Sequence, residues 1–326
     1  MDFGLTPRID PGACTIKEVV VMKRVLIVYY SQSGDVTRAA ESFTKYLKIP
    51  EVELTWECIK ARDNYPYPWR LYKFFDVFPE CVNEEPPEIY PPKFSQDDKF
   101  DLVILAYQVW FLAPSLPIQG FLKSKYAKVL KNTKVITLIL CRNMWHSASE
   151  IMKRMIAEVG GIHIDNVVLT HQGPPLATFI TTPRLLFTGK KNRFLRVLPA
   201  AGARDEDIYA LSRFGKRLAN NIEALNNYSH QPMLKGLGAV EVNQRYVIPE
   251  LIGRILYQPW ANIARFFGKQ GSWRRIPIIC IFALHLLFAI PIVLLFSTLV
   301  QFVFGFLINR KLASYVENLK SPSGVI

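Results

Sequence analysis

Residues 24–37 read RVLIVYYSQSGDVT and predict a buried strand that turns directly into a helix. The run Arg24–Tyr30 is apolar and rich in branched and aromatic residues, which is typical of a strand covered on both faces. The loop that follows is rich in hydroxyls and contains no lysine. A phosphate placed there would meet backbone N–H groups at a helix N-terminus, together with the hydroxyls of Ser31, Ser33 and Thr37.

The sequence of the loop matches neither of two common phosphate-binding motifs. A P-loop NTPase needs G-x-x-x-x-G-K-[ST], and a dinucleotide-binding turn needs G-x-G-x-x-G; neither occurs here. A hydroxyl-rich loop without cations suits a phosphate monoester, and the alternative is an ordinary N-cap in a serine-rich turn. The loop resembles that of the flavodoxin superfamily. This resemblance implies an FMN cofactor whose phosphate is bound by Ser31, Gln32, Ser33, Gly34, Asp35, Val36 and Thr37.

Similar apolar runs alternate with helical patterns further along the chain. The runs are Val52–Trp56, Leu102–Ala106, Val135–Leu140 and Val167–Thr170. Helical spacing occurs at Val36–Leu47, Ser147–Val159 and Asp205–Leu225, and more weakly at Pro117–Lys128. Five strands that alternate with helices predict an α/β fold with a flavodoxin-like, doubly wound, five-stranded parallel sheet.

The ligand of a doubly wound sheet lies at the carboxyl ends of the strands. The loops expected after the third and fourth strands are Tyr107–Ser115 and Cys141–His146, and both carry aromatic side chains that can stack on a flavin ring. The first also resembles the W-x-x-x-P loop of flavodoxin-like quinone reductases. We expect the two loops to supply further cofactor-binding residues, namely Gln108, Val109, Trp110, Phe111, Cys141, Arg142, Asn143, Met144 and Trp145.

Arg142 is the one cation in these two loops. Placed near the N1–C2=O edge of a flavin, its guanidinium would stabilise the anionic reduced ring and favour hydride uptake. The alternative is an ion pair between Arg142 and a carboxylate such as Asp35 or Glu150.

Two long segments interrupt the alternation. Asp63–Pro92 is dense in proline and aromatic residues, which indicates an ordered excursion over one edge of the sheet. Its residues Tyr65, Tyr67 and Trp69 are candidates for a lid that excludes water from the flavin. Pro174–Gly202 interleaves apolar residues with Arg184, Lys190, Lys191, Arg193 and Arg196. This pattern suits a membrane-surface segment or a lid, and equally an amphipathic packing helix.

The alternation of strand and helix patterns that is typical of a soluble α/β domain ends after Leu225. Pro249–Phe267 has the spacing of an interfacial helix, and Pro277–Ile308 contains no Lys, Arg, Asp or Glu. As one helix, these 32 residues would span ~48 Å against a ~30 Å hydrocarbon core. Pro291 divides the stretch, and cationic pairs flank both of its ends. We therefore expect a shallow membrane hairpin bent near Pro291, with one tilted span or a buried pair of soluble helices as alternatives.

The predicted organisation has five parts. They are a disordered extension (1–21), a flavodoxin-like FMN-binding domain (22–228), an amphipathic interfacial region (229–275), a membrane hairpin or span (276–309) and a tail (310–326). The stretch Arg184–Ile326 has 19 Lys and Arg against 7 Asp and Glu, so it carries 12 of the 13 net positive charges. A basic region beside an apolar one attracts the anionic lipid of the cytoplasmic leaflet, and no nucleic-acid-binding signature accompanies it.

Cysteine usage and the first residues bear on the compartment. The five cysteines are odd in number and never spaced as C-x-x-C, so neither a disulfide framework nor a metal site is expected. Met1–Ile16 carries charges and two prolines where a signal peptide would have an apolar core. We expect the protein in a reducing compartment, at the cytoplasmic face of the inner membrane, with membrane lipid as a partner and not nucleic acid.

Five stretches, taken in order, resemble the dialkylresorcinol-condensing enzyme family over Lys23–Tyr257. They are VLIVYYSQSG (25–34), YPYPW (65–69), AYQVWFLAPSLPI (106–118), CRNMW (141–145) and RFGK (213–216). The resemblance implies that a partner ketosynthase builds a dialkylcyclohexane-1,3-dione, which the flavodoxin-like protein converts to a dialkylresorcinol. The Cys-His-Asn or Cys-His-His arrangement of a condensing enzyme is not indicated here.

Conversion of such a dione to a resorcinol removes two hydrogens and is therefore an oxidation. FMN can accept a ring hydride at N5 while a base takes the acidic proton beside a carbonyl. Candidate bases are His146, next to Trp145, His171, at the end of the fifth strand, and Tyr107. We expect an FMN-dependent oxidoreductase, an aromatase, whose substrate is a small lipophilic cyclohexanedione.

Two other functions fit the same residues. An NAD(P)H:quinone or flavin reductase would face membrane quinones and would be reduced by NAD(P)H. A membrane-bound electron-transfer module would form a stable semiquinone, although the nearly neutral first half of the chain differs from the acidic surface usual in flavodoxins. The sequence leaves open the alkyl chain lengths, the terminal electron acceptor and the oligomeric state, including a homodimer.

Overall fold

A parallel sheet forms the centre of the computed structural model, which describes residues 22–195, 197–226 and 232–323. Five strands run parallel in the order β2-β1-β3-β5-β6. They are β1 (Lys23–Tyr29), β2 (Val52–Cys58), β3 (Leu102–Trp110), β5 (Lys134–Cys141) and β6 (Ile162–Thr170). This is the flavodoxin strand order, so the predicted fold class is confirmed. A short sixth strand, β4 (Ala113–Pro114), pairs antiparallel with β3 and was not predicted.

The helices follow the predicted alternation with some breaks. They are α1 (Asp35–Thr44), α2 (Leu71–Asp76), α3 (Phe78–Val82), α4 (Leu116–Leu122), α5 (His146–Glu158), α6 (Pro175–Thr188), α7 (Asp205–Ala210), α8 (Ser212–Ala219), α9 (Val247–Phe266) and α10 (Ile276–Lys320). Short 3-10 helices occupy Lys45–Leu47, Lys125–Leu130, Glu223–Asn226, Gln244–Tyr246 and Trp273–Arg275. The predicted helix Asp205–Leu225 is therefore divided into α7, α8 and a 3-10 turn. The predicted extension 1–21, Arg196 and the boundary at residue 228 lie outside the described residues.

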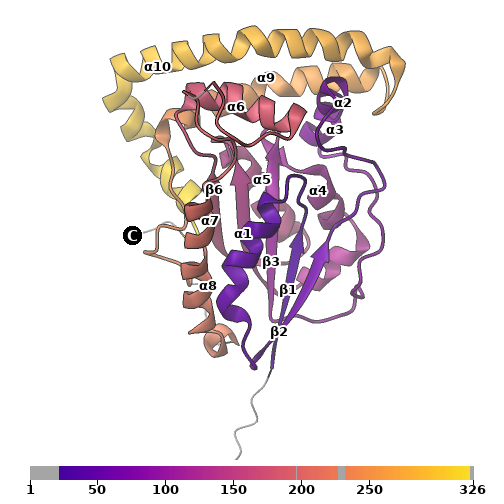
Figure 1. Cartoon of the computed structure of the whole chain (residues 1–326), viewed down its shortest axis with the longest axis vertical. Coiled ribbons are helices and arrows are strands. Elements are labelled where there is room, and N and C mark those ends of the chain that lie inside the picture. The colour runs from indigo at the N-terminus through magenta and orange to yellow at the C-terminus, as the bar shows by residue number, and fades with distance from the viewer. Residues whose placement is uncertain (1–21, 196, 227–231, 324–326) are drawn as a thin grey trace, which may run out of the picture.

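Helices cover both faces of the sheet (Figure 1). One face is buried beneath side chains of α1 and α8, including Phe43 and Phe214, and the other beneath α4 and α5, including Phe121 and Met152. Helix α8 approaches α1 closely because residue 215 is glycine, since a Cβ there would lie 1.7 Å from the carbonyl oxygen of Phe43. The central strands are thus buried on both sides, as their continuous apolar runs predict.

The excursion Asp63–Pro92 forms α2 and α3, which hold the start of α10. Arg275 Nε donates to Asp76 Oδ1 (2.7 Å), and its two Nη atoms donate to the carboxylate of Glu80 (2.7 and 3.0 Å). The side chains of Arg275 and Asp76 are fully buried. A buried guanidinium is stable only with such charged partners. This cluster therefore fixes the start of α10 to the sheet domain.

Helix α10 does not form the hairpin predicted at Pro291. It is one helix of 45 residues with Pro291 inside it. Pro291 lies on the exposed side, whereas Leu286 and Ser297, on either side of it, are buried against the domain. We attribute the continuity of α10 to this packing, which offsets the one hydrogen bond that proline removes. Figure 1 shows α10 crossing the top of the molecule and then bending down one side.

Helices α6, α9 and α10 cover the end of the molecule toward which the strands point (Figure 1). Within α10 and the turn before it, Trp273–Gly305 spans 33 residues and is long and apolar enough to cross a membrane, by length and composition. The structure thus places the most apolar segment of the described chain over the carboxyl edge of the sheet. In a doubly wound fold, this edge is where ligands bind.

Candidate cofactor and substrate site

The loop Ser31–Thr37 connects β1 directly to α1, as predicted. Gly34 is the N-cap residue of α1 and has a φ of +87°. As a glycine, it supplies no side-chain hydrogen bond to cap the helix. The backbone N–H of Thr37 donates to Ser31 Oγ (3.3 Å). A Cβ built on Gly34 would meet nothing within 4 Å, so open space lies in front of the helix N-terminus. The loop therefore has the backbone geometry and the free volume that a phosphate requires.

A cation reaches this loop from a distant part of the chain. Lys191 Nζ forms an ion pair with Asp35, whose side chain is buried, and Arg38 Nη1 lies 3.6 Å from the same carboxylate. The segment Pro174–Gly202 can lie this close because residue 202 is glycine, since a Cβ there would be 3.0 Å from Asp35 Oδ2. The loop contains no lysine of its own, but in the folded structure Lys191 lies beside it. Of the alternatives left open for this segment, the structure supports a cover over the loop.

The predicted aromatic lid also packs on the loop. Gln32 Oε1 accepts a hydrogen bond from Trp69 Nε1 (2.8 Å), and Gln32 Nε2 donates to the carbonyl of Pro66 (3.2 Å). The rings of Tyr65 and Trp69 lie 5.2 and 5.5 Å from that of Trp110. The excursion Asp63–Pro92 and the end of β3 thus meet at the phosphate loop.

Several buried hydroxyls around this cover have no hydrogen-bond partner among the described residues. They belong to Tyr65, Tyr67 and Thr181. Asp35 contributes to raising the pKa of Tyr67, after burial, so Tyr67 lies close to the loop. A buried hydroxyl without a partner costs about 1–3 kcal/mol. These groups are therefore available to a polar ligand between the loop and its cover.

The first predicted ring-binding loop is in part a strand. Strand β3 continues to Trp110 and returns through Phe111 and Leu112, both with positive φ, into β4. Tyr107 is therefore buried within the sheet, whereas Trp110 and Phe111 stand at the tip of a tight hairpin. Gln108 Oε1 accepts from Trp110 Nε1 (3.3 Å), which holds the indole in place. Val109 pairs with Pro114 in the same hairpin.

The second loop places Arg142 between two covering helices. Its guanidinium lies 4.0 Å above the ring of Phe179 in α6, and its pKa is lowered by burial, while Tyr246 and Tyr257 of the α9 region oppose that shift. Both carboxylates considered for an ion pair are taken by other cations, Asp35 by Lys191 and Glu150 by Lys153 (2.8 Å). Arg142 is therefore a desolvated cation that an anionic ligand would stabilise.

The remaining loop residues divide between two environments. Asn143 Nδ2 donates to Thr178 Oγ1 of α6 (3.3 Å). Cys141 ends β5 and is buried, and Met144 precedes Trp145, which is also buried. The indole of Trp145 packs in the core and does not belong to the aromatic cluster of Trp110. Its stacking on a flavin ring stays a prediction.

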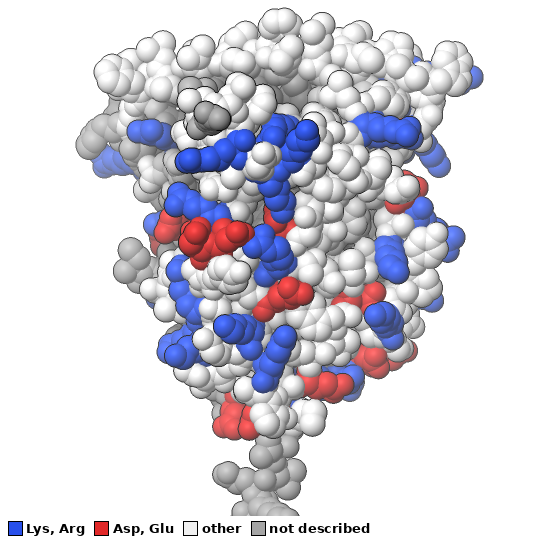
Figure 2. Space-filling view, in the orientation of Figure 1, with Lys and Arg blue, Asp and Glu red and all other residues white. Residues whose placement is uncertain are grey.

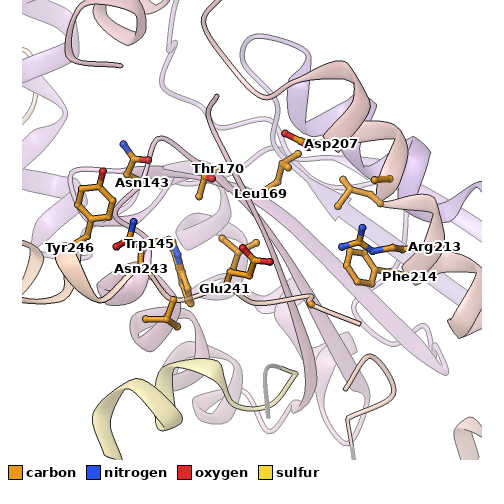
Figure 3. A pocket seen from close by; sticks show the side chains of 15 residues that line it. Asn143, Trp145, Leu169, Thr170, Asp207, Arg213, Phe214, Glu241, Asn243 and Tyr246 are labelled. Carbon is orange, nitrogen blue, oxygen red and sulfur yellow. The ribbon is translucent and has the colours of Figure 1, made fainter. Parts of the chain in front are cut away.

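Trp145 also lines a groove at the surface, which the sequence did not indicate. Its volume is about 440 Å³, and it lies between β6, the α7–α8 pair and the segment after Leu237. Figure 3 shows Asp207 and Arg213 on one side and Asn143, Asn243 and Tyr246 on the other. The groove lies at the edge strand of the sheet. Asn143, which lines the groove, also donates to Thr178 of α6.

His171 lies at the end of β6 and belongs to the phosphate-loop region. Its Nδ1 is 3.4 Å from Thr182 Oγ1 of α6. Burial lowers its pKa to about 4, Asp35 opposes this, and the cations Arg142 and Lys191 lower it further. The imidazole is therefore neutral at pH 7. The structure brings His171, Asp35, Arg142 and Lys191 together although they are far apart in sequence.

A second candidate base, His146, is buried together with Glu250. His146 Nδ1 lies 2.7 Å from Glu250 Oε2, and the two side chains are 2% and 1% exposed. The contact lacks hydrogen-bond alignment, and neither imidazole nitrogen of His146 has a hydrogen-bond partner among the described residues. Glu250 Oε1 accepts from the backbone N–H of Ser147 (2.6 Å). Glu250 therefore fixes both the imidazole and the start of α5.

The third candidate base, Tyr107, is buried within β3 beside Cys141. Burial raises its pKa well above the ordinary value, and the neighbouring Cys141 adds to the effect. Glu250 in turn adds to the burial that raises the pKa of Cys141. Tyr107 is therefore a neutral hydroxyl that can donate a hydrogen bond, and it is not a base at pH 7. Among the described residues, no group of three His, Cys, Asp or Glu side chains could hold a metal ion.

Sequence reasoning missed Lys191 and Glu250 as members of the site. Lys191 lies 156 residues after Asp35, and Glu250 follows His146 by more than a hundred positions. The interleaved basic residues of Pro174–Gly202 marked the region of Lys191 but not its target. Glu250 carried no local signal, although it is the one acid in α9.

No protein-family model matches this chain, and the comparison with curated proteins gives no match. Among solved structures, the chain is similar to an FMN-bound flavoprotein from Lactobacillus acidophilus NCFM, with 21% identity, a TM-score of 0.37, and coverage of 45% of this chain and 93% of that one. A flavoprotein from Bacteroides eggerthii DSM 20697 gives 17% identity, a TM-score of 0.36, and coverage of 45% and 87%. A WrbA-like flavodoxin from Agrobacterium tumefaciens gives 11% identity and a TM-score of 0.34, with coverage of 64% of this chain and 99% of that one. These similarities are weak, and the fold class rests on the strand order of the sheet itself.

Proposed function

We propose that the chain binds FMN at Ser31–Thr37 and acts as an FMN-dependent oxidoreductase. The observation that carries this proposal is the covered helix N-terminus. Open space at Gly34 lies beside the Lys191 cation, under a cover that contains buried hydroxyls without partners. A phosphate ester fits the N–H groups and the cation, and the hydroxyls suit the polar atoms of the rest of the cofactor.

The charges near the loop are compatible with a phosphate. Asp35 alone would repel an anion, but Lys191 and Arg38 balance its charge. The aromatic surfaces of Trp110, Tyr65 and Trp69 lie next to the loop through Gln32 and would pack against the flavin ring. Arg142 would stabilise negative charge on the reduced ring or on a substrate oxygen.

The chemistry divides between the cofactor and the chain. When bound, FMN supplies a two-electron acceptor that takes a hydride from a substrate carbon. His146 would take the accompanying proton at Nε2, while Glu250 stabilises the imidazolium that results. Tyr107 would donate a hydrogen bond to a substrate carbonyl oxygen. One hydride and one proton are thus removed from a cyclohexane-1,3-dione, which leaves the aromatic resorcinol.

For the substrate we propose a dialkylcyclohexane-1,3-dione made by a partner ketosynthase. The proposal is supported by the resemblance of the sequence to dialkylresorcinol-condensing enzymes and by the apolar helices α6 and α9 that enclose Arg142. A dione of this kind is acidic and carries alkyl chains, so an arginine between apolar helices suits both of its parts.

Anaerobic mixing tests this function. We expect FMN in the purified full chain to be bleached by a short-chain 2,5-dialkylcyclohexane-1,3-dione, with one equivalent of resorcinol found by mass spectrometry. NADPH and NADH should bleach it far more slowly. Bleaching by NAD(P)H alone without resorcinol would assign a reductase instead. A stable semiquinone during one-electron titration, with no reaction with the dione, would assign an electron-transfer module.

A further inference from the structure

The outer face of α10 is apolar and has no partner in the structure. The helix buries residues on one side at intervals of three or four, such as Ile279, Phe282 and Leu286. The opposite side exposes a long series of large apolar residues, namely Ile281, Leu284, Leu287, Phe288, Ile292, Leu295, Phe296, Leu299, Phe302, Val303 and Phe304. The side chains of Leu295 and Phe302 are 73% and 86% exposed. A patch of this length far exceeds what soluble proteins leave in water.

Both ends of α10 are held by the same domain. At its start, Arg275 binds Asp76 and Glu80, and the ring of Phe282 stacks on that of Phe78 at 3.7 Å. Near its middle, Gln301 Nε2 donates to the carbonyl of Arg245 (3.2 Å). A helix that crossed a bilayer would carry its ends to opposite sides.

The C-terminal end of α10 also contacts the sheet domain. Val316 and Leu319 pack with Val247, and Ser323 Oγ donates to Asp165 Oδ1 of β6 (2.9 Å). The two ends of α10 therefore lie on one side of any membrane that its outer face contacts.

Exposed charges next to the apolar face have one sign. From Val247 to Val316 the exposed charged residues are Arg254, Lys269, Arg274, Arg310 and Lys311, and the one acid in this range, Glu250, is buried. The next acid, Glu317, is exposed near the end of α10 and lies 3.6 Å from Lys320 Nζ. Figure 2 shows an uncharged top surface with Lys and Arg side chains gathered directly beneath it. Trp273 is also exposed, beside Arg274.

We propose that this face is a membrane-docking surface that lies in the plane of an anionic bilayer, without crossing it. An apolar face bordered by cations matches a lipid surface with anionic headgroups. A second copy of this chain is a poorer occupant, because a symmetric pair would bring two positively charged borders together. The carboxyl edge of the sheet, under α6 and α9, then faces the lipid. This inference does not depend on which cofactor or substrate the protein binds.

Vesicle flotation tests the surface. We expect the full chain to float with vesicles that contain phosphatidylglycerol, and more weakly with pure phosphatidylcholine or at high salt. The double variant Leu295→Glu/Phe302→Glu should lower the partition coefficient at least ~10-fold, because charge replaces apolar contact. Tyr209→Glu, which changes an exposed residue on α7, is the matched control and should float like the unaltered chain. Equal flotation of all three proteins would overturn the proposal.

Cysteine labelling tests the orientation. In a Cys280→Ser background, Arg274→Cys and Lys311→Cys should both react with an impermeant maleimide added outside the vesicles, whereas Leu295→Cys should be protected only when vesicles are present. Protection of one end alone would show that α10 crosses the bilayer. Protection of Leu295→Cys without vesicles, together with a dimer by light scattering, would assign the face to a second copy. Either result contradicts the proposal.

Discussion

Gly34→Ala is expected to lower the affinity of the chain for FMN about 100-fold. The methyl group would occupy the open space before the N-terminus of α1, where the structure leaves room for a phosphate. Hydrogen bonds to a charged group contribute ~1.5–3 kcal/mol each, so losing one or two of them corresponds to about two powers of ten in Kd. Titration of the apoprotein with FMN, followed by flavin fluorescence, measures the effect.

Gly236→Ala is the matched control for this variant. Gly236 has φ +78°, close to the +87° of Gly34, and a Cβ there would also meet nothing within 4 Å. Both substitutions therefore carry the same backbone strain, of ~1–2 kcal/mol. Equal losses of stability with a loss of FMN affinity only in Gly34→Ala support the phosphate site. Equal FMN affinities in the two variants would refute it.

His146→Asn is expected to reduce the rate of dione oxidation at least ~100-fold while FMN remains bound, because general base catalysis contributes ~10²–10⁴. The carboxylate of Glu250 lies 2.7 Å from Nδ1, and Nε2 has no hydrogen-bond partner among the described residues, so Nε2 is available to accept a proton. Stopped-flow bleaching of the flavin by the dione measures the rate. The flavin content of the purified variant measures retention of the cofactor.

His163→Asn is the control for loss of a buried histidine. His163 lies in β6 with its Nε2 2.8 Å from Thr137 Oγ1, and it is not part of the candidate site. This variant should oxidise the dione at the original rate. If His146→Asn also keeps the original rate, the His146–Glu250 pair serves only to attach α9. Equal losses in both variants would mean that the loss in His146→Asn reflects damage to the fold, and would remove the support for a base at this position.

The fold could be predicted because its signals are local. Each apolar run of four to seven residues marks a buried strand, and the sharp change from Tyr30 to Ser31 marks a loop at the end of one of them. Strand β3 was predicted too short because Tyr107 and Gln108 read as polar loop residues. In the structure they continue the ladder with β5 before the chain turns at Phe111.

Only the part of the candidate site that is contiguous in sequence could be predicted. The other residues join it through tertiary contacts. The residues of the β1–α1 loop are contiguous, so their spacing carried the prediction of a phosphate site. The cation beside them comes from Lys191, and the partner of His146 comes from Glu250 in α9. Such pairs depend on how segments pack, which no local spacing encodes.

The error at Pro291 has a similar cause. Proline commonly breaks a helix because it removes one hydrogen bond and crowds the preceding turn. In α10 the residues before and after it pack on the domain, as Leu286 and Ser297 show, while Pro291 itself stays exposed. Packing of the two halves on one surface therefore outweighs the local preference. That both ends of the segment stay on one side of a membrane, as the flanking cationic pairs indicate, stays a prediction.

Comparison of FMN with riboflavin tests the central claim most directly, because the two ligands differ only in the phosphate. The claim is that the loop Ser31–Thr37, beneath its cover of Lys191 and the aromatic excursion, holds a flavin through this group. We expect the full-length apoprotein to take up one FMN per chain and to bind riboflavin at least ~100-fold more weakly, since charge-assisted hydrogen bonds are lost. Equal affinities, or no uptake of either flavin, would contradict the account.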